Sequence, residues 1–164
     1  SVAGLEEAVL EARVREWFER EVRHRLRKGA PAVLERHRAL GDRLVLATSG
    51  TSYAARAAAE AYGLEEVVAT CLDVADGRLT GRIATLCLGP AKADAVMAWA
   101  ETTGADLAGA TFYTDSASDL TLLERVAHPV VVNPDRALRR IAAQRGWPVV
   151  DWDKVSPVAS TSSG

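Results

Sequence analysis

The residues best suited to chemistry follow short apolar runs, and the first group is Thr48-Ser49-Gly50, directly after residues 43–47. Its hydroxyls, with the backbone N–H groups that open the following helix, could cradle an anion, because a helix N-terminus carries free donors and partial positive charge. An ordinary helix N-cap uses the same residue types. Taken alone, this segment favours the N-cap interpretation over a phosphate site.

A second group places Asp115 and Asp119 four residues apart, directly after the apolar residues 110–113. Two carboxylates held in one small site repel each other unless a cation or hydrogen-bond donors neutralise them. Mg²⁺ is a natural partner for such oxygen ligands. The alternative is that Asp115 only ends a strand while Asp119 or Ser118 caps a helix, and this alternative suits Asp119 better than Asp115.

Lys92 is the third candidate, because it opens a helix that follows Gly89-Pro90. A lysine at a helix N-terminus opposes the helix dipole, and this small cost suggests a role beyond helix formation. The alternative is a lysine that simply faces solvent.

The three histidines predict no catalytic or metal-binding cluster. His24 and His37 lie on charged helices and are expected to face solvent, while His128 precedes a strand at the end opposite the candidate site. No Gly-rich nucleotide loop is present.

Elements that would position these residues alternate along the chain. Apolar runs predict strands at 43–47, 67–71, 110–113, 129–132 and 148–150, and Asp76-Gly77 predicts a hairpin turn. Periodicity and boundary residues predict helices over 4–27, 31–40, 53–62, 90–103, 120–126 and 133–146. Such alternation predicts a doubly wound, mostly parallel α/β sheet, whose ligands bind at the carboxyl ends of its strands.

Composition narrows the class of protein. The 164 residues suit one domain, and a net charge of -2 from 20 basic and 22 acidic residues predicts no broad attraction to nucleic acid. Glu16, Glu19 and Glu21 are interleaved with a local cluster of basic residues, which favours a solvated helix face with charge pairs three and four residues apart. The basic residues are Arg20, Arg23, Arg25, Arg27 and Lys28.

No stretch is apolar over the roughly 20 residues that a membrane span needs, so no membrane partner is expected. Glu6 and Glu7 argue against a signal peptide, and the missing initiator Met suggests a processed or truncated piece. Cys71 and Cys87 are expected to be buried thiols of a cytoplasmic protein rather than a disulfide. The Ser- and Thr-rich tail at 156–164 is expected to be flexible.

The order and spacing of three motifs resemble the haloacid dehalogenase (HAD) superfamily, and within it the phosphoserine-phosphatase-like branch (subfamily IB). LVLATSGTS resembles the motif whose hydroxyl binds the transferring phosphoryl group, GPAKADAV the motif of the neutralising lysine, and FYTDSASDLTLL the motif whose acids hold Mg²⁺. The resemblance implies catalytic roles for Lys92 and Thr48, phosphate binding by Thr48, Ser49, Gly50 and Lys92, and metal binding by Asp115 and Asp119.

Further segments agree with this branch: DVADGRLTGRI resembles its hairpin, and HPVVVNPDRALRRIAAQRGWPVVDW resembles its C-terminal end. The resemblance implies a Rossmann-like HAD core at 29–155, a helical cap remnant at 1–28 and a tail at 156–164. It also implies a Mg²⁺-dependent phosphatase that acts on a small phosphomonoester through an aspartyl-phosphate.

One motif of the family is absent from this chain. The family's DxDx[TV] segment, which carries the aspartate nucleophile and a general acid, ends a strand in the middle of the sheet, between the strands that lead to Thr48 and to Asp115. Three alternatives follow: an N-terminal segment supplies the strand, another chain donates it, or the protein is a non-catalytic phosphate-binding module. Without the strand, two facing strand edges would stay unpaired.

Overall fold

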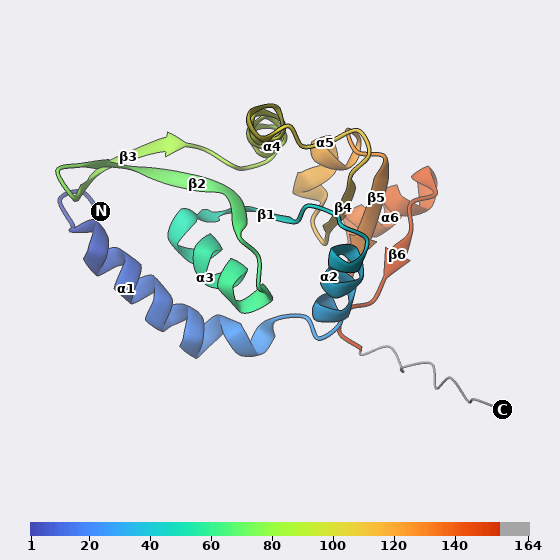
Figure 1. Ribbon diagram of the computed structural model, residues 1–164, viewed down its shortest axis with the longest axis horizontal. Coiled ribbons are helices and arrows are strands. Elements are labelled where there is room, and N and C mark those ends of the chain that lie inside the picture. The colour runs from blue at the N-terminus through green and yellow to red at the C-terminus, as the bar shows by residue number, and fades with distance from the viewer. Residues whose placement is uncertain (155–164) are drawn as a thin grey trace.

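The strands of the computed structural model, which describes residues 1–154, form two three-stranded sheets (Figure 1). The first has the order β1-β2-β3, and its strands are Val45–Thr51, Glu66–Ala75 and Arg78–Thr85. The second has the order β4-β5-β6, and its strands are Thr111–Thr114, His128–Val132 and Val149–Val150. Within the first sheet β1 and β2 are parallel and β3 is antiparallel, whereas the second sheet is wholly parallel.

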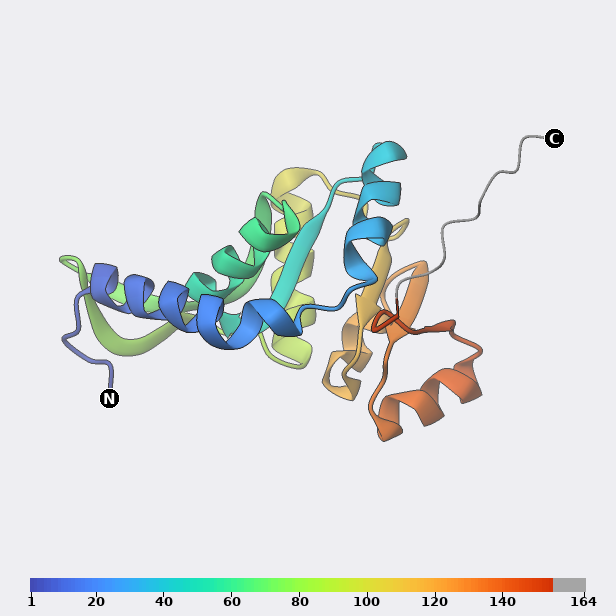
Figure 2. The ribbon, with the colours of Figure 1, turned by 90° about the horizontal axis from the view of Figure 1, so that it is seen from below.

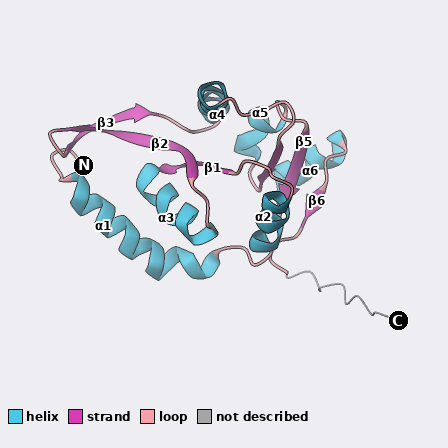
Figure 3. Ribbon diagram, viewed as in Figure 1, coloured by secondary structure: helices cyan, strands magenta, loops and turns pink. Residues whose placement is uncertain are grey.

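The predicted mostly parallel α/β class is therefore confirmed, but the strands do not form one continuous sheet. Both β1 and β4 lie at the edge of their sheets, and among the described residues neither has a neighbour on its outer side. Figure 3 shows the two sets of strands as separate groups, with helices around each.

The helices occupy most of the predicted positions. They are α1 Glu7–Trp17, α2 Ala30–Ala39, α3 Ser52–Tyr62, α4 Pro90–Thr103, α5 Leu120–Leu123 and α6 Arg136–Arg145. A 3₁₀ turn, η3 Ala117–Asp119, precedes α5. Pro90 in the first turn and Gly104 just past the last give α4 the bounds that the sequence predicts.

The single helix predicted over 4–27 is wrong in its bounds and regularity. Gly4 has a φ of +83°, so α1 begins only at Glu7, and it passes into a π turn, η1 Phe18–Val22, and a 3₁₀ turn, η2 Arg23–Arg25. Residues before α1 instead extend the edge of β3, since Gly4 N donates to Leu79 O at 2.7 Å. In Figure 2, α1 runs beside α3 and the β2–β3 hairpin, on the side away from the second sheet.

The predicted hairpin turn is confirmed, because β2 and β3 pair antiparallel around Asp76-Gly77. Asp76 and Gly77 have φ angles of +52° and +74°, the paired left-handed conformation that matches the twist of two adjoining strands.

Two apolar clusters hold the site-bearing elements in place. Leu123, Val131 and Leu138 form one cluster between α5, β5 and α6, and all three are at most 1% exposed. Ala93, Val96 and Leu122 join α4 to α5, with Ala47 of β1 and Phe112 of β4 packed against them. These clusters fix the first turn of α4 relative to the carboxyl ends of β1 and β4.

Candidate active site

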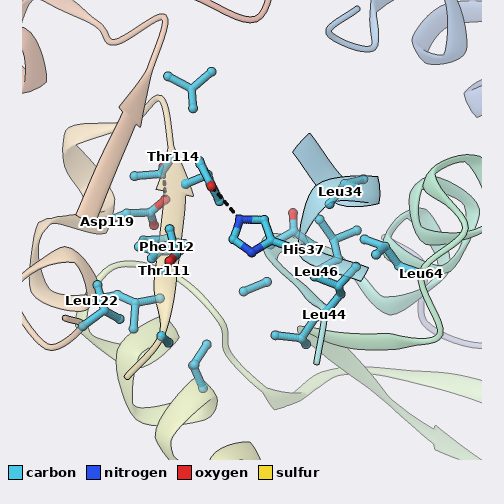
Figure 4. A pocket seen from close by; sticks show the side chains of 18 of the residues that line it. Leu34, His37, Leu44, Leu46, Leu64, Thr111, Phe112, Thr114, Asp119 and Leu122 are labelled. Atoms are coloured by element: carbon cyan, nitrogen blue, oxygen red, sulfur yellow. Dashed lines mark hydrogen bonds between the residues drawn. The ribbon is translucent and has the colours of Figure 1, made fainter. Parts of the chain in front are cut away.

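A cavity of about 830 Å³ lies between the facing edges of β1 and β4. Figure 4 shows apolar side chains lining this space, with Leu44, just before β1, and Leu46 of β1 across from Phe112 and Leu122. Five of the six residues that the resemblance selects line it; they are Thr48, Ser49, Lys92, Asp115 and Asp119, while Gly50 does not. The fold thus brings three segments that are far apart in sequence to one cavity.

Lys92 and Asp119 form a buried ion pair at the base of this cavity. Lys92 Nζ lies 2.8 Å from Asp119 Oδ1, and their side chains are 8% and 7% exposed, so a solvent-facing Lys92 is wrong. Thr114 Oγ1 donates a 2.6 Å hydrogen bond to the other carboxylate oxygen, Oδ2. Among the described residues, Oδ1 accepts no well-aligned hydrogen bond, so its contact with Lys92 is electrostatic.

The turn at Thr48 is not the cap of α3. Thr51 has that role, with its Oγ1 accepting from Ala54 N at 3.4 Å. Pairing of β1 with β2 breaks after Ala47 and resumes at Thr51, so β1 bulges across residues 48–50. Thr48 Oγ1 accepts from Gly50 N at 3.1 Å, which folds this bulge back on itself.

Asp115 directly follows β4 and is partnered by a residue that the sequence did not indicate as part of the site. Arg27 Nη2 lies 2.9 Å from Asp115 Oδ2, and Arg27 Nη1 lies 2.8 Å from Asp153 Oδ1. Burial lowers the pKa of the Arg27 guanidinium, but its two carboxylate partners outweigh this and raise that pKa overall. The expected solvated face is therefore wrong for Arg27, whose guanidinium lines the cavity.

The alternative roles for the acidic loop are also wrong in detail. Ser116, rather than Asp119 or Ser118, caps the 3₁₀ turn by accepting from Ser118 N. Asp119 makes no side-chain cap to α5. Its carboxylate points instead to Thr114 and Lys92.

His37 does not face solvent as expected, because its side chain is 15% exposed. Its Nε2 lies 2.6 Å from the hydroxyl of Tyr113 and its Nδ1 lies 2.7 Å from Asp42 Oδ2. Trp152 packs against the other side of Tyr113, with ring centroids 5.0 Å apart. These contacts link α2, β4 and the end of the described chain beside the cavity.

Both cysteines are free thiols, as expected, but only Cys87 is fully buried. Burial raises the pKa of the Cys87 thiol, which makes it a weak nucleophile.

Two carboxylates meet only part of what a magnesium site needs. Asp115 and Asp119 supply hard oxygen ligands, and Mg²⁺ in proteins keeps several waters and takes one or two carboxylates. Within residues 1–154, however, no group of three or more acidic, histidine or cysteine side chains is arranged around one point. Arg27 and Lys92 already neutralise the two acids.

Comparison with known families identifies the family of the chain. The model of the haloacid dehalogenase-like hydrolases matches residues 1–124. The chain belongs to this family. It is 39% identical to the "inhibition of morphological differentiation protein" of Streptomyces azureus over 76% of its length, and 31% identical to a Mycobacterium tuberculosis protein named phosphoserine phosphatase over 92% of its length.

This HAD chain spans about half the length of those curated relatives, 46% and 49% respectively. A solved structure from Bordetella pertussis, described as a protein of unknown function, superposes on it with a TM-score of 0.84 and 35% identity. That match covers 92% of this chain and 70% of the other. The family and fold that the motifs predict are thus confirmed. Among residues 1–154, no helix is both long and apolar enough to cross a membrane.

Proposed function

We propose that this HAD chain is part of a Mg²⁺-dependent phosphatase that hydrolyses a small phosphomonoester. The convergence of Thr48, Lys92 and Asp119 on one cavity carries the proposal. A hydroxyl, an ammonium and a carboxylate at one point suit phosphoryl transfer, which depends on positioning and on neutralising charge.

In this proposal Thr48 and Ser49 of the bulge hold the phosphoryl oxygens. The Gly50 N–H is donated to Thr48 Oγ1 and holds the bulge in shape. Lys92 neutralises the charge on the phosphoryl group and the nucleophile. Its pairing with Asp119 keeps the ammonium fixed before substrate arrives, so that little reorganisation is needed during the reaction.

Asp115 and Asp119 would hold the metal, which would supply a positive charge close to the transferring group. Arg27 neutralises Asp115 in this structure. Metal binding therefore requires Asp115 to exchange the guanidinium for the ion.

The nucleophile would be an aspartate on a strand that inserts between β1 and β4. Its carboxylate attacks phosphorus, the bond from phosphorus to the substrate oxygen breaks, and a second aspartate gives that oxygen a proton. Water then hydrolyses the aspartyl-phosphate, releasing phosphate and restoring the carboxylate. The strand would come from a segment upstream of Ser1 or from another chain that carries this motif. The cavity of about 830 Å³, with a strand edge on each side, supports the insertion of such a strand.

The substrate would be a small phosphorylated metabolite, because the helical segment at residues 1–28 belongs to the cap that closes over the site in the family. We expect the protein to meet this metabolite in the cytoplasm. A relative named phosphoserine phosphatase suggests a phosphorylated amino acid or a similar molecule. Neither nucleic acid nor membrane is expected as a partner.

A second candidate is a non-catalytic phosphate-binding module, or one half of a split protein. The observation that favours it is charge balance, since each acid of the site already has a cationic partner, Arg27 for Asp115 and Lys92 for Asp119. Such a site could bind phosphate through Lys92 and the bulge without turning over a substrate.

The test is the intact mass of the protein expressed from its complete gene, followed by an assay with Mg²⁺ and p-nitrophenyl phosphate. We expect a mass above the 17.5 kDa of this chain and turnover that falls at least about a hundredfold in Asp115→Asn. The control is Asp73→Asn, which removes a carboxylate on the β2–β3 hairpin whose one side-chain partner within residues 1–154 is Thr80. A protein of 17.5 kDa without turnover would leave the binding module as the better function.

A further inference from the structure

The side chain of Thr70 lies between two of the three segments that form the site. Thr70 belongs to β2, is 7% exposed, and stands opposite Thr51, where β1 resumes its pairing after the bulge. On its other side runs the connection from β3 to α4, which leads to Lys92. Thr70 itself is not among the residues that line the cavity.

One hydroxyl joins these two segments. Thr70 Oγ1 donates to the carbonyl of Ser49 at 3.0 Å and accepts from the backbone N–H of Cys87 at 3.1 Å. A hydroxyl has a single hydrogen to donate. Thr70 therefore donates it to the Ser49 carbonyl of the bulge and accepts the Cys87 N–H of the connection with a lone pair. Both partners are backbone groups outside the β1–β2 and β2–β3 pairing, where a ladder bond does not fix them.

Each bond controls the position of one group of the site. The Ser49 carbonyl sits inside the bulge of residues 48–50, so holding it sets the direction of the Thr48 hydroxyl. Cys87 is fully buried and comes just before the first turn of α4, in which Lys92 N donates to Gly89 O at 3.0 Å. Fixing the Cys87 amide therefore fixes where the helix that carries Lys92 begins.

We propose that Thr70 is a positioning residue that holds the phosphate-binding bulge and the lysine-bearing helix at a set separation. The inference rests on the proposed function, because the group held between Thr48 and Lys92 would be the substrate phosphate. Contacts to a phosphoryl group weaken steeply when donors move away, so a loose Thr70 link lowers turnover more than it raises KM.

The test compares three variants of the complete protein. Thr70→Val keeps the shape and removes the hydroxyl, Thr70→Ser keeps the hydroxyl, and Thr103→Val is the matched control. Thr103 Oγ1 donates to Trp99 O at 2.7 Å at the far end of α4, so this control loses a hydroxyl–carbonyl bond without touching the site.

We expect Thr70→Val to lower kcat by about tenfold or more and to weaken inorganic phosphate binding by about tenfold, with a smaller change in KM. Thr70→Ser and Thr103→Val should stay within about twofold of the wild type. A purely structural Thr70 would lower the melting temperature of Thr70→Val but leave kcat per folded molecule unchanged, and that result overturns the proposal.

Hydrogen exchange in the wild type keeps the inference testable if Thr70→Val does not fold. Adding inorganic phosphate should slow exchange of the Cys87 and Gly50 amides together, because one hydroxyl couples their segments. A Cys87 amide that exchanges as fast with phosphate as without it overturns the coupling. Wild-type protein that binds phosphate but shows no turnover contradicts the proposed phosphatase function only. In that case the phosphate affinity of Thr70→Val and the amide exchange of the wild type still test the positioning role of Thr70.

Discussion

At the scale of single residues, the Lys92–Asp119 pair makes the strongest energetic prediction. Both side chains are less than a tenth exposed, so removing one leaves an uncompensated charge in the interior. We expect Lys92→Met to lower the free energy of unfolding by about 3–5 kcal/mol, and the double variant Lys92→Met, Asp119→Leu to recover part of it. Urea denaturation measures both values.

The exposed pair Arg23–Glu19 is the matched control for this measurement. Its side chains are 50% and 58% exposed, so solvent screens the charges and Arg23→Met should leave the unfolding midpoint unchanged. If Lys92→Met and Arg23→Met lowered the free energy of unfolding equally, the buried pair would not stabilise the fold more than an exposed pair does.

Which site residues could be foreseen depends on how near in sequence their signals lie. Thr48, Lys92 and Asp115 each stand beside an apolar run or a helix start, and these local patterns mark them. Arg27 and His37 carry no such mark, because their partners Asp115 and Tyr113 are 88 and 76 residues away. The same argument applies to Thr70. In the sequence it is one more residue of a predicted strand, and only the fold places it between the β1 bulge and the connection to α4.

At the scale of elements, the packing of α1 on α3 makes a prediction about pH. Tyr53 of α3 is 3% exposed, and its hydroxyl donates to Glu7 of α1 at 2.9 Å. Burial, together with this bond to Glu7, raises the pKa of Tyr53 to about 12. The folded state thus keeps the phenol protonated at a pH where the unfolded chain, with a tyrosine pKa of about 10, ionises.

The stabilising effect of Tyr53 is therefore fully present below about pH 10 and is lost as pH rises towards 12. We expect thermal unfolding, followed by circular dichroism between pH 9 and about 11.5, to show a melting temperature that falls more steeply in the wild type than in Tyr53→Phe. Other groups titrate equally in both proteins, so the difference isolates Tyr53. Parallel curves would show that the phenol ionises freely in the folded state.

Elements with residue-specific boundary signals were predictable, whereas irregular ones were not. Pro90 and Gly104 bound α4, and Asp76-Gly77 turns the hairpin, because these residue types satisfy demands that few others can. The change from α to π geometry at Phe18 has no such signal, since apolar residues continue at helical spacing through it. The bulge in β1 was hidden for another reason: it depends on Thr70, a residue of the neighbouring strand.

At the scale of the whole molecule, the strands form two sheets because, among the described residues, no strand lies between β1 and β4. The second sheet has its own apolar cluster, and another cluster on α4 and α5 contacts both sheets through Ala47 and Phe112. The halves therefore keep their arrangement without a central strand. The sequence resemblance implied the unpaired edges, but not the contacts that hold the halves together beside the cavity. Among these are the His37–Tyr113 hydrogen bond and the pairing of Arg27 with Asp115 and Asp153.

Unpaired strand edges are templates for another strand, so the 164-residue chain alone should associate with itself. We expect sedimentation velocity to show oligomers that grow with concentration, and Thr111→Lys to reduce them, because this change puts a charge on the cavity-lining edge strand β4. Val149→Lys is the control, since Val149 is 44% exposed on β6, at the opposite edge of the same sheet. A chain that stays monomeric, or one that both lysines affect equally, would show that the β1–β4 cavity is closed to strands. Association that disappears when a strand carrying the missing motif is supplied would instead identify such a strand as the natural occupant.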